Sequence, residues 1–361
     1  MAATCGDPTA RGFRALLALG ALLAAGCRSA PAPLPAAEGP APAQITAIPV
    51  TPACARAVSR QVDNSGFAVV ISADELLSAG GMQALGDLFR RVRGIPCVRS
   101  VRDAGQLLVL AIDEMDLAAE PLVPAGGLAG AGLRERLGAF QEQIDPALLS
   151  ADGRTTALLA ELGRSADPKS DQRIRESILS ALSDLPAGWQ GYVVEYPVAA
   201  GESLRWQDRR ARQALALLNR ELAGGGLLEV GVACEGDDCL LEPRHLAAID
   251  RFCRIAAAQR RVRAVRSLVD TIRAARKARS GDPALPGTQE EALGLLAALA
   301  DSGGMRHLAD ERFQRAVVRV HFETGNAADY CTLGRNLKKA AREASGESLV
   351  FTVIKPGRSG M

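Results

Sequence analysis

Apolar residues follow two spacings along the chain, and together they predict strands and helices in a repeated order. Short runs rich in Val, Ile and Leu are typical of strands, and apolar residues three or four positions apart are typical of one helix face. In the first half these patterns predict strand 67–71, helix 82–95, strand 98–102, strand 155–161, helix 171–183 and strand 192–196. In the second half they predict strand 227–232, helix 243–256, strand 265–270, strand 316–322, helix 332–344 and strand 349–354.

The two halves share one pattern. Val265-Arg-Ser-Leu-Val-Asp270 echoes Val98-Arg-Ser-Val-Arg-Asp103 at the end of the first β-α-β group of each half. Each half has β-α-β, a variable connection and a second β-α-β, which is the ferredoxin-like arrangement. We therefore expect an α+β fold of two ferredoxin-like units in tandem, related by a pseudo-two-fold axis. The units are residues 50–200 and 227–356, and a charged helix with a flexible Gly hinge at 201–226 joins them.

The N-terminus has the pattern of an export signal. Two arginines precede an unbroken apolar stretch, residues 15–25, and small residues follow it. The run Leu23-Ala-Ala-Gly-Cys27 resembles a bacterial lipobox, although it departs from the commonest form three residues before the cysteine. We expect residues 1–26 to be a lipoprotein signal peptide, Cys27 to be acylated and the Ala- and Pro-rich residues 27–49 to be a tether. An ordinary cleaved signal with a chance cysteine is the alternative.

Six cysteines remain when the signal peptide and Cys27 are set aside. An even number in an exported chain favours disulfides, and the sequence leaves their pairing open. Burial on an apolar helix face can protect Cys253 as a free thiol. Zinc bound by Cys234 and Cys239 is an alternative, but no second Cys or His pair stands at ligand spacing. The possible disulfide cysteines are Cys54, Cys97, Cys234, Cys239, Cys253 and Cys331.

Composition and charge narrow the classes of partner. Hydrophobic residues make up 48% of the 361 residues, enough for at least one full core. The 43 Lys and Arg residues nearly balance the 41 Asp and Glu residues, so the net charge of +2 gives no field that would gather nucleic acid. Beyond the signal peptide no apolar run approaches the roughly 20 residues that cross a bilayer. We therefore expect neither a nucleic-acid partner nor a polytopic membrane protein.

Basic residues gather between Arg251 and Arg279. They suggest a surface for anionic lipid head groups or for an acidic partner. In the alternative interpretation, which the near-neutral net charge favours, the arginines cover helix surface and pair with carboxylates from elsewhere in the fold. The possible basic surface consists of Arg260, Arg261, Arg263, Arg266, Arg273, Arg276 and Lys277.

The sequence offers no recognisable catalytic motif. It contains no Walker loop, no dinucleotide-binding glycine fingerprint, no HExxH and no GxSxG, and it indicates no cofactor and no metal. The three histidines, His245, His307 and His321, fall in positions that favour solvated side chains over a catalytic base. A Ser-His-Asp arrangement assembled by the fold is the alternative.

Several stretches of the sequence carry a likeness to a known family. They are residues 67–103, 149–159, 185–194 and 227–354, with the phrases Val265-Arg-Ser-Leu and Asp282-Pro-Ala-Leu-Pro286. They resemble the two extramembrane loops of exporters of the resistance-nodulation-division (RND) superfamily, especially its MmpL-like, hydrophobe-exporting branch. The resemblance covers most of residues 65–356. It implies porter-like soluble units and a role in the movement of hydrophobes.

The chain departs from that family where membrane helices are expected. Residues 201–226 stand between the two loops and carry many charges, each of which costs at least about 3 kcal/mol near the centre of a bilayer. Transport in the family depends on ionisable residues inside the membrane, and the segments that could hold them are missing. We therefore expect that this chain is not a pump by itself.

These observations predict a non-enzymatic, lipid-anchored protein on the periplasmic side of a bacterial envelope. The expected partners are a lipid or other hydrophobic small molecule, bound in a cleft between the two units, and an inner-membrane transporter. Arg28 follows the acylated position where an Asp would favour the inner membrane, so the outer membrane is expected. An envelope hydrolase with an unrecognised site and a purely structural lipoprotein are the alternatives.

Overall fold

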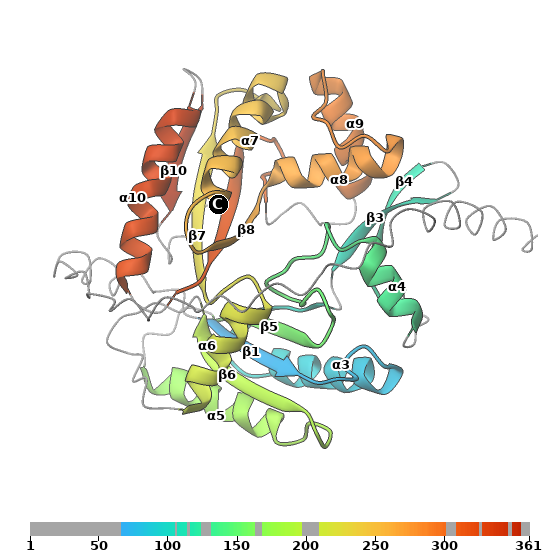
Figure 1. Ribbon diagram of the computed structural model, residues 1–361, viewed down its shortest axis with the longest axis vertical. Helices are drawn as coiled ribbons and strands as arrows, with labels where there is room; N and C mark the ends of the chain where they lie inside the picture. Colours follow the sequence, from blue (N-terminus) through green and yellow to red (C-terminus); the bar gives the residue numbers. More distant parts are fainter. Residues whose placement is uncertain are drawn as a thin grey trace, which may run out of the picture. The chain divides into compact units, whose positions relative to one another are not determined.

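The computed structural model describes residues 66–104, 107–113, 116–123, 131–162, 168–196, 209–300, 308–324, 327–345 and 349–354. Within these ranges the chain forms an α+β fold with two four-stranded sheets and one two-stranded sheet (Figure 1), so the predicted α+β class is confirmed. The predicted signal peptide 1–26, Cys27, the tether 27–49, Cys54 and His307 lie outside the described residues. No helix in the described part is both long and apolar enough to cross a membrane.

The first sheet has the strand order β2-β5-β1-β6, and all its pairs are antiparallel. β1 is almost wholly buried, which explains its continuous apolar run. The Ser78 side chain accepts a hydrogen bond from the Gly81 backbone and caps the N-terminus of α3. The elements are β1 (Gly66–Ser72), α3 (Ala79–Arg93), β2 (Val98–Arg102), β5 (Thr155–Leu162), α5 (Pro168–Leu182) and β6 (Gln190–Tyr196).

The second sheet has the corresponding order, β10-β7-β9-β8, again with antiparallel pairs throughout. The side chains of Ala316, Val318, Val320 and Phe322 alternate along β9 and enter the core beneath the helices. The elements are β7 (Gly226–Ala233), η3 (Cys239–Leu241), α7 (Pro243–Ala257), β8 (Val262–Arg266), β9 (Arg315–Phe322), α10 (Ala327–Ala344) and β10 (Val350–Ile354).

The two sheets share a local irregularity. The register of β2 against β5 shifts between Val98 and Ser100, and that of β8 against β9 shifts between Val262 and Ala264. In both sheets the residue before the edge strand has a φ of +72°. The edge strand of the second half is therefore 262–266, and the predicted strand at 265–270 is wrong.

A helix start replaces that predicted strand. Ser267 and Asp270 form a capping box at the N-terminus of α8 (Leu268–Ser280), in which the Ser267 backbone donates to the Asp270 carboxylate at 2.7 Å. The apolar residues that follow are spaced for a helix, and Leu268, Val269 and Ile272 are buried. The similarity between the short sequences of the two halves therefore placed the predicted strand three residues too late in the chain.

Each sheet carries an insertion between its second and third strands in chain order, and the two insertions meet. In the first it is the hairpin of β3 (Leu108–Asp113) and β4 (Asp116–Pro121), followed by α4 (Ala131–Ala139). In the second it is α8 followed by α9 (Gln289–Ala300). The hairpin contacts both α8 and α9, and Leu110 of β3 belongs to the core beneath the second sheet.

The segment between the halves is a packed helix rather than a loose connection. α6 (Arg209–Glu221) lays its apolar face on the first sheet and contributes to a core with β1, β5 and β6. Residues 224–226, predicted as a flexible hinge, are buried. A Cβ at Gly224 would lie 2.3 Å from the Phe322 carbonyl oxygen, and Gly224 has a φ of +103°. Glycine is required here by close packing and by its left-handed conformation.

Candidate functional site

A buried polar contact joins the two sheets. Tyr196 is the last residue of β6 in the first sheet, and its hydroxyl lies 3.3 Å from Nδ1 of His321, which stands on β9 in the second sheet. His321 is only 1% exposed and Tyr196 6%. His321 Nε2 has no hydrogen-bond partner in the described part of the chain. The contact therefore ties the sheets together through groups that tolerate little rearrangement.

Asp145, which precedes β5, adds a charge to this contact. Burial and the positive charges of neighbouring arginines, Arg102 foremost, together lower the pKa of His321 to about 4, although the Asp145 carboxylate opposes the shift. Burial acts to raise the pKa of Asp145, yet His321, Arg102 and a hydrogen bond from the Ala147 backbone at 2.9 Å together hold it below its usual value. His321 is consequently neutral at pH 7 and Asp145 is ionised.

Three arginines surround this pair. Arg319 makes an ion pair with Glu229 at 3.1 Å on the same sheet face. Arg266 donates to the Glu142 carbonyl at 3.0 Å and also to the Ile144 carbonyl. The second sheet is therefore hydrogen-bonded to the loop that carries Asp145. We call Asp145, Tyr196, His321, Arg102, Arg266, Arg319 and Glu229 the inter-sheet cluster. Charged side chains thus occupy the sheet contact where the sequence suggested an apolar cleft.

The histidines are not solvated as the sequence suggested. His321 was placed on a polar outer face, but that face of β9 packs against the first sheet. His245 is 4% exposed, and its Nδ1 lies 2.6 Å from the Cys239 carbonyl oxygen. Both predictions of exposure are wrong, because alternation along one strand cannot tell solvent from a second packed layer. Asp145 and Tyr196 carried no local signal that would have linked them to His321.

A surface groove lies beside α5, β6 and α6 of the first half. Its volume is about 340 Å³, and it is open to solvent. Leu179 and Leu182 form an apolar floor. Gly191 completes this floor, and it packs so closely that a Cβ there would come within 2.8 Å of both Leu182 and Leu185. The lining residues are Leu179, Leu182, Ser183, Gln190, Gly191, Tyr192 and Arg210. The lining mixes these apolar residues with Ser183, Gln190 and Arg210, and the apolar floor and small volume suit one acyl chain or a small hydrophobe.

A second cavity lies inside the first half and is nearly closed. It has a volume of about 10 Å³, room for one water-sized group, and Leu76, Met82 and Leu133 are among its apolar lining residues. It is a packing void in its present form and offers no ligand site.

The cysteines divide into bonded and free forms. Cys234 and Cys239 form a disulfide across the turn between β7 and η3, so they do not bind zinc here and the disulfide prediction is confirmed for this pair. Cys331 is also disulfide-bonded. Cys97 and Cys253, which the sequence counted among possible disulfide cysteines, are free. Burial raises the pKa of the Cys253 thiol to about 12, which makes it inert.

Most of the predicted basic surface is paired internally. Arg261 pairs with Asp329, Arg263 with Glu323, Arg273 with Asp250, and Lys277 with Glu142. Arg266 belongs to the inter-sheet cluster, and Arg260 is exposed. These residues therefore do not form the free basic surface that the sequence suggested, because carboxylates from other elements reach them.

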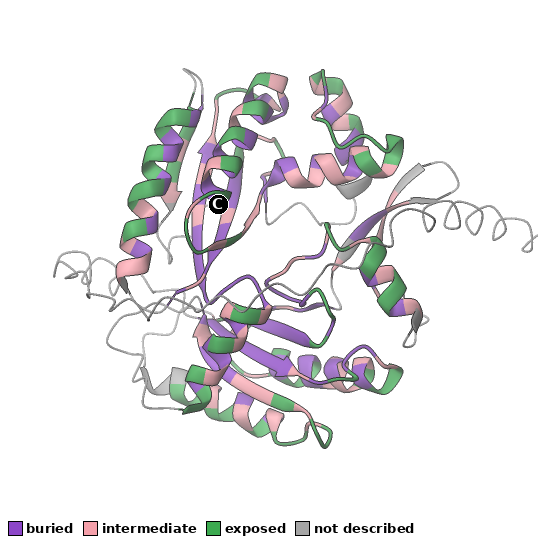
Figure 2. Cartoon of the chain, viewed as in Figure 1, coloured by how far each residue is buried: buried purple, intermediate pink, exposed green. Residues whose placement is uncertain are grey.

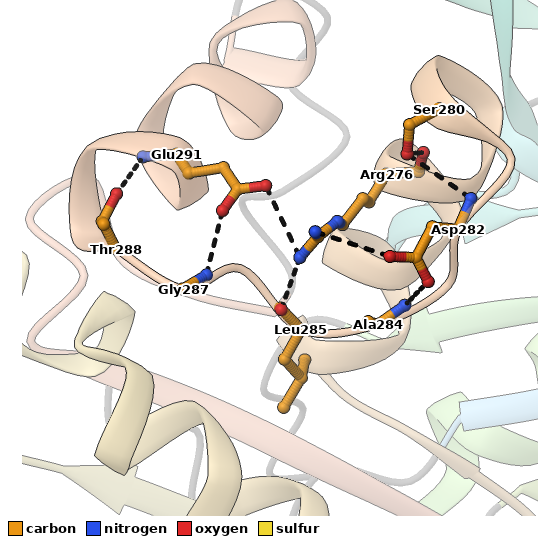
Figure 3. A network of polar contacts seen from close by, with 8 residues as sticks. All are labelled: Arg276, Ser280, Asp282, Ala284, Leu285, Gly287, Thr288 and Glu291. Atoms are coloured by element: carbon orange, nitrogen blue, oxygen red, sulfur yellow. Dashed lines mark hydrogen bonds and ion pairs between the residues drawn. The ribbon is translucent and has the colours of Figure 1, made fainter.

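Arg276 organises the loop between α8 and α9 (Figure 3). Its guanidinium donates to the Leu285 carbonyl at 2.5 Å and lies 3.5 Å from both Asp282 and Glu291. The same carboxylates accept hydrogen bonds at 2.9 Å from the backbone N–H groups of Ala284 and Gly287. The arginine is thus a structural clamp on residues 282–286, one of the phrases that carried the family resemblance.

The chain was compared with protein-family models and with curated proteins. No family model matches the chain, and no curated protein matches it.

Proposed function

We propose that the chain is a lipid-anchored protein of the bacterial envelope, facing the periplasm, that binds a lipid or other hydrophobe. Its body resembles the soluble region of an RND, MmpL-like transporter, and it acts beside an envelope transporter. The observation that carries the proposal is the open groove over Leu179, Leu182 and Gly191, which offers apolar surface to an acyl chain. The groove replaces the inter-unit cleft that the sequence suggested.

The strand orders support the porter-like part of the proposal. In each half the third strand and the fourth strand flank the first, and the second strand lies outside the third. This is the order of a ferredoxin-like unit, and its recurrence with the same bulge is what a tandem, pseudo-two-fold pair would give. We therefore propose two such units, with α6 and its glycine turn between them.

The size of the groove sets the kind of ligand. At about 340 Å³ it stands at the lower end of small-molecule sites. A single acyl chain buried against leucines would gain about 25 cal/mol for each Å² removed from water, which is compatible with micromolar affinity. The chain has no coupled energy source of its own in this proposal, so it carries a ligand downhill or presents it to a transporter.

A titration of the mature chain with fluorescent fatty acids and phospholipids tests the proposal. Leu182→Gln places an amide in the floor of the groove and should weaken binding about tenfold, because a buried polar group without a partner costs about 1–3 kcal/mol. Leu293→Gln is the matched control, since Leu293 is a half-buried leucine of α9 far along the chain from the groove. Equal affinities in the two variants, or no binding by the parent, would reject the groove as the site.

Anchoring is tested separately. Mass spectrometry of the N-terminal peptide from the envelope-extracted protein should show acyl chains on Cys27. Crosslinking of the anchored form in cells should recover an inner-membrane transporter. An unmodified terminus at another residue would reject the anchor without bearing on the groove.

A further inference from the structure

The exposed side of the helices over the second sheet carries basic residues, most of which lie outside the basic surface predicted from the sequence. α7 and α10 contact each other and cover one face of the second sheet (Figure 1). Buried residues of α10 such as Leu333 and Leu337 face the core, and the opposite side of the helix is exposed (Figure 2). Exposed basic residues of this face, which we call the helical basic face, are Arg251, Arg260, Arg335, Lys338, Lys339 and Arg342.

The spacing of these residues makes a continuous stripe. Arg335, Lys338, Lys339 and Arg342 are three, four and seven positions apart, so they project from one side of α10 over about 10 Å of helix. The turn after α7 lies against this helix, because the Asn336 amide donates to the Gln259 side chain at 3.0 Å. Arg260 follows Gln259 directly and is exposed.

These charges lack the partners that basic residues find elsewhere in this unit. In the described part of the chain Arg335, Lys338 and Arg342 make no ion pair, whereas Arg261, Arg263 and Arg273 each have a carboxylate. Lys339 pairs only with the exposed Glu343, at 3.8 Å. A solvated helix face ordinarily mixes both signs of charge, as the whole chain does with 43 basic and 41 acidic residues. The local excess of positive charge therefore favours binding of an anionic partner.

We propose that the helical basic face docks on the anionic head groups of a phospholipid bilayer. The proposal rests on the proposed lipid anchor in one respect, because the anchor keeps the body close to a membrane. A bilayer fits because the stripe is exposed, with basic groups on long side chains and a buried apolar side that is unavailable for insertion. Each Lys or Arg near an anionic surface raises affinity roughly fivefold.

Vesicle flotation with the unacylated mature chain, Cys27→Ser, tests this without any contribution from the anchor. The probes are vesicles of phosphatidylcholine alone and vesicles that also contain phosphatidylglycerol. We expect binding to the second kind only, and we expect added salt to weaken it because screening shortens the range of surface charges. Lys338→Gln with Arg342→Gln should weaken binding about thirtyfold, since two contributions of about fivefold are lost.

A matched control separates this stripe from overall charge. Arg93→Gln with Arg99→Gln changes the net charge equally at two exposed positions of the first half. We expect this pair to bind anionic vesicles as the parent does, and circular dichroism should show that both pairs fold. Equal losses in the two pairs, or no preference for phosphatidylglycerol, would overturn the proposal, and so would capture of an acidic protein by α10 without vesicle binding. The outcome is independent of acylation and of hydrophobe titration.

Discussion

The hydroxyl of Tyr196 and the Nδ1 of His321 meet at 3.3 Å, although 125 residues separate them and they belong to different sheets. The imidazole stays neutral in this position, because it is buried and its neighbours Arg102, Arg319 and Arg266 already supply positive charge. Protonation would place a further cation among them with little water. The contact between the sheets is therefore sensitive to acid.

The stability of the protein should fall as the pH falls from about 7 to about 5. The pKa of His321 drops from 6.5 in the unfolded chain to about 4 in the folded protein, so the unfolded chain binds the additional proton over this range. Linkage predicts a loss on the order of 2 kcal/mol, and the lowered pKa of Asp145 extends the loss to more acid conditions. Urea unfolding at the two pH values measures it.

A His321→Gln variant should remove most of this pH dependence, because Gln keeps polar atoms but does not titrate. Tyr196→Phe is the companion variant. It should lower the free energy of unfolding by about 1 kcal/mol while leaving the pH slope in place, since the imidazole stays buried. An unchanged slope in His321→Gln would show that another group governs the acid response.

Most strands of the two four-stranded sheets and the α+β class could be predicted because they depend on local pattern, whereas the β3–β4 hairpin and the inter-sheet cluster could not. Val317, Arg319 and His321 alternate with the core residues of β9, and that alternation is the same whether the second face meets water or another sheet. The capping box at Ser267 and Asp270 could be recognised in the sequence. The similarity of residues 265–270 to residues 98–103 led instead to the prediction of a strand there. Ion pairing of the arginines depends on carboxylates that are distant in sequence.

The Arg276 clamp should contribute measurably to stability. Arg276→Ala removes the donor to the Leu285 carbonyl and leaves Asp282 and Glu291 without their shared cation. We expect the free energy of unfolding to fall by about 1–2 kcal/mol, with the hydrogen bond to the carbonyl contributing more than the partly exposed ion pairs.

Limited proteolysis of the loop between α8 and α9 reports on the same clamp. Arg276→Ala should be cut faster than the parent in residues 281–288, and Arg276→Lys should be intermediate because Lys lacks the planar fork. Arg279→Ala, an exposed position near the end of α8, is the control and should behave as the parent does. Equal cutting rates in Arg276→Ala and Arg279→Ala would contradict the clamp.

Gly226 at the start of β7 should tolerate no side chain. A Cβ there would lie 2.6 Å from the ring of Phe322, which is fully buried and stacks edge-on with Tyr330 at 4.8 Å between centroids. Gly226→Ala should lower stability by about 1–3 kcal/mol through overpacking. Gly294→Ala on α9 has open space and should instead raise stability by about 0.5–1 kcal/mol, so thermal melts of the two variants should move in opposite directions.

Thiol labelling tests the cysteine assignment. Without reductant, alkylation of the native protein should modify Cys97, which is exposed, and should reach Cys253 only after unfolding, because that thiol is buried and has a raised pKa. Peptide mapping should link Cys234 to Cys239. Cys331 is disulfide-bonded to none of these four, so mapping should find it linked to a cysteine outside the described residues. Labelling of Cys331 in the unreduced, unfolded protein would contradict that pairing, whereas a Cys27–Cys331 link would contradict acylation of Cys27.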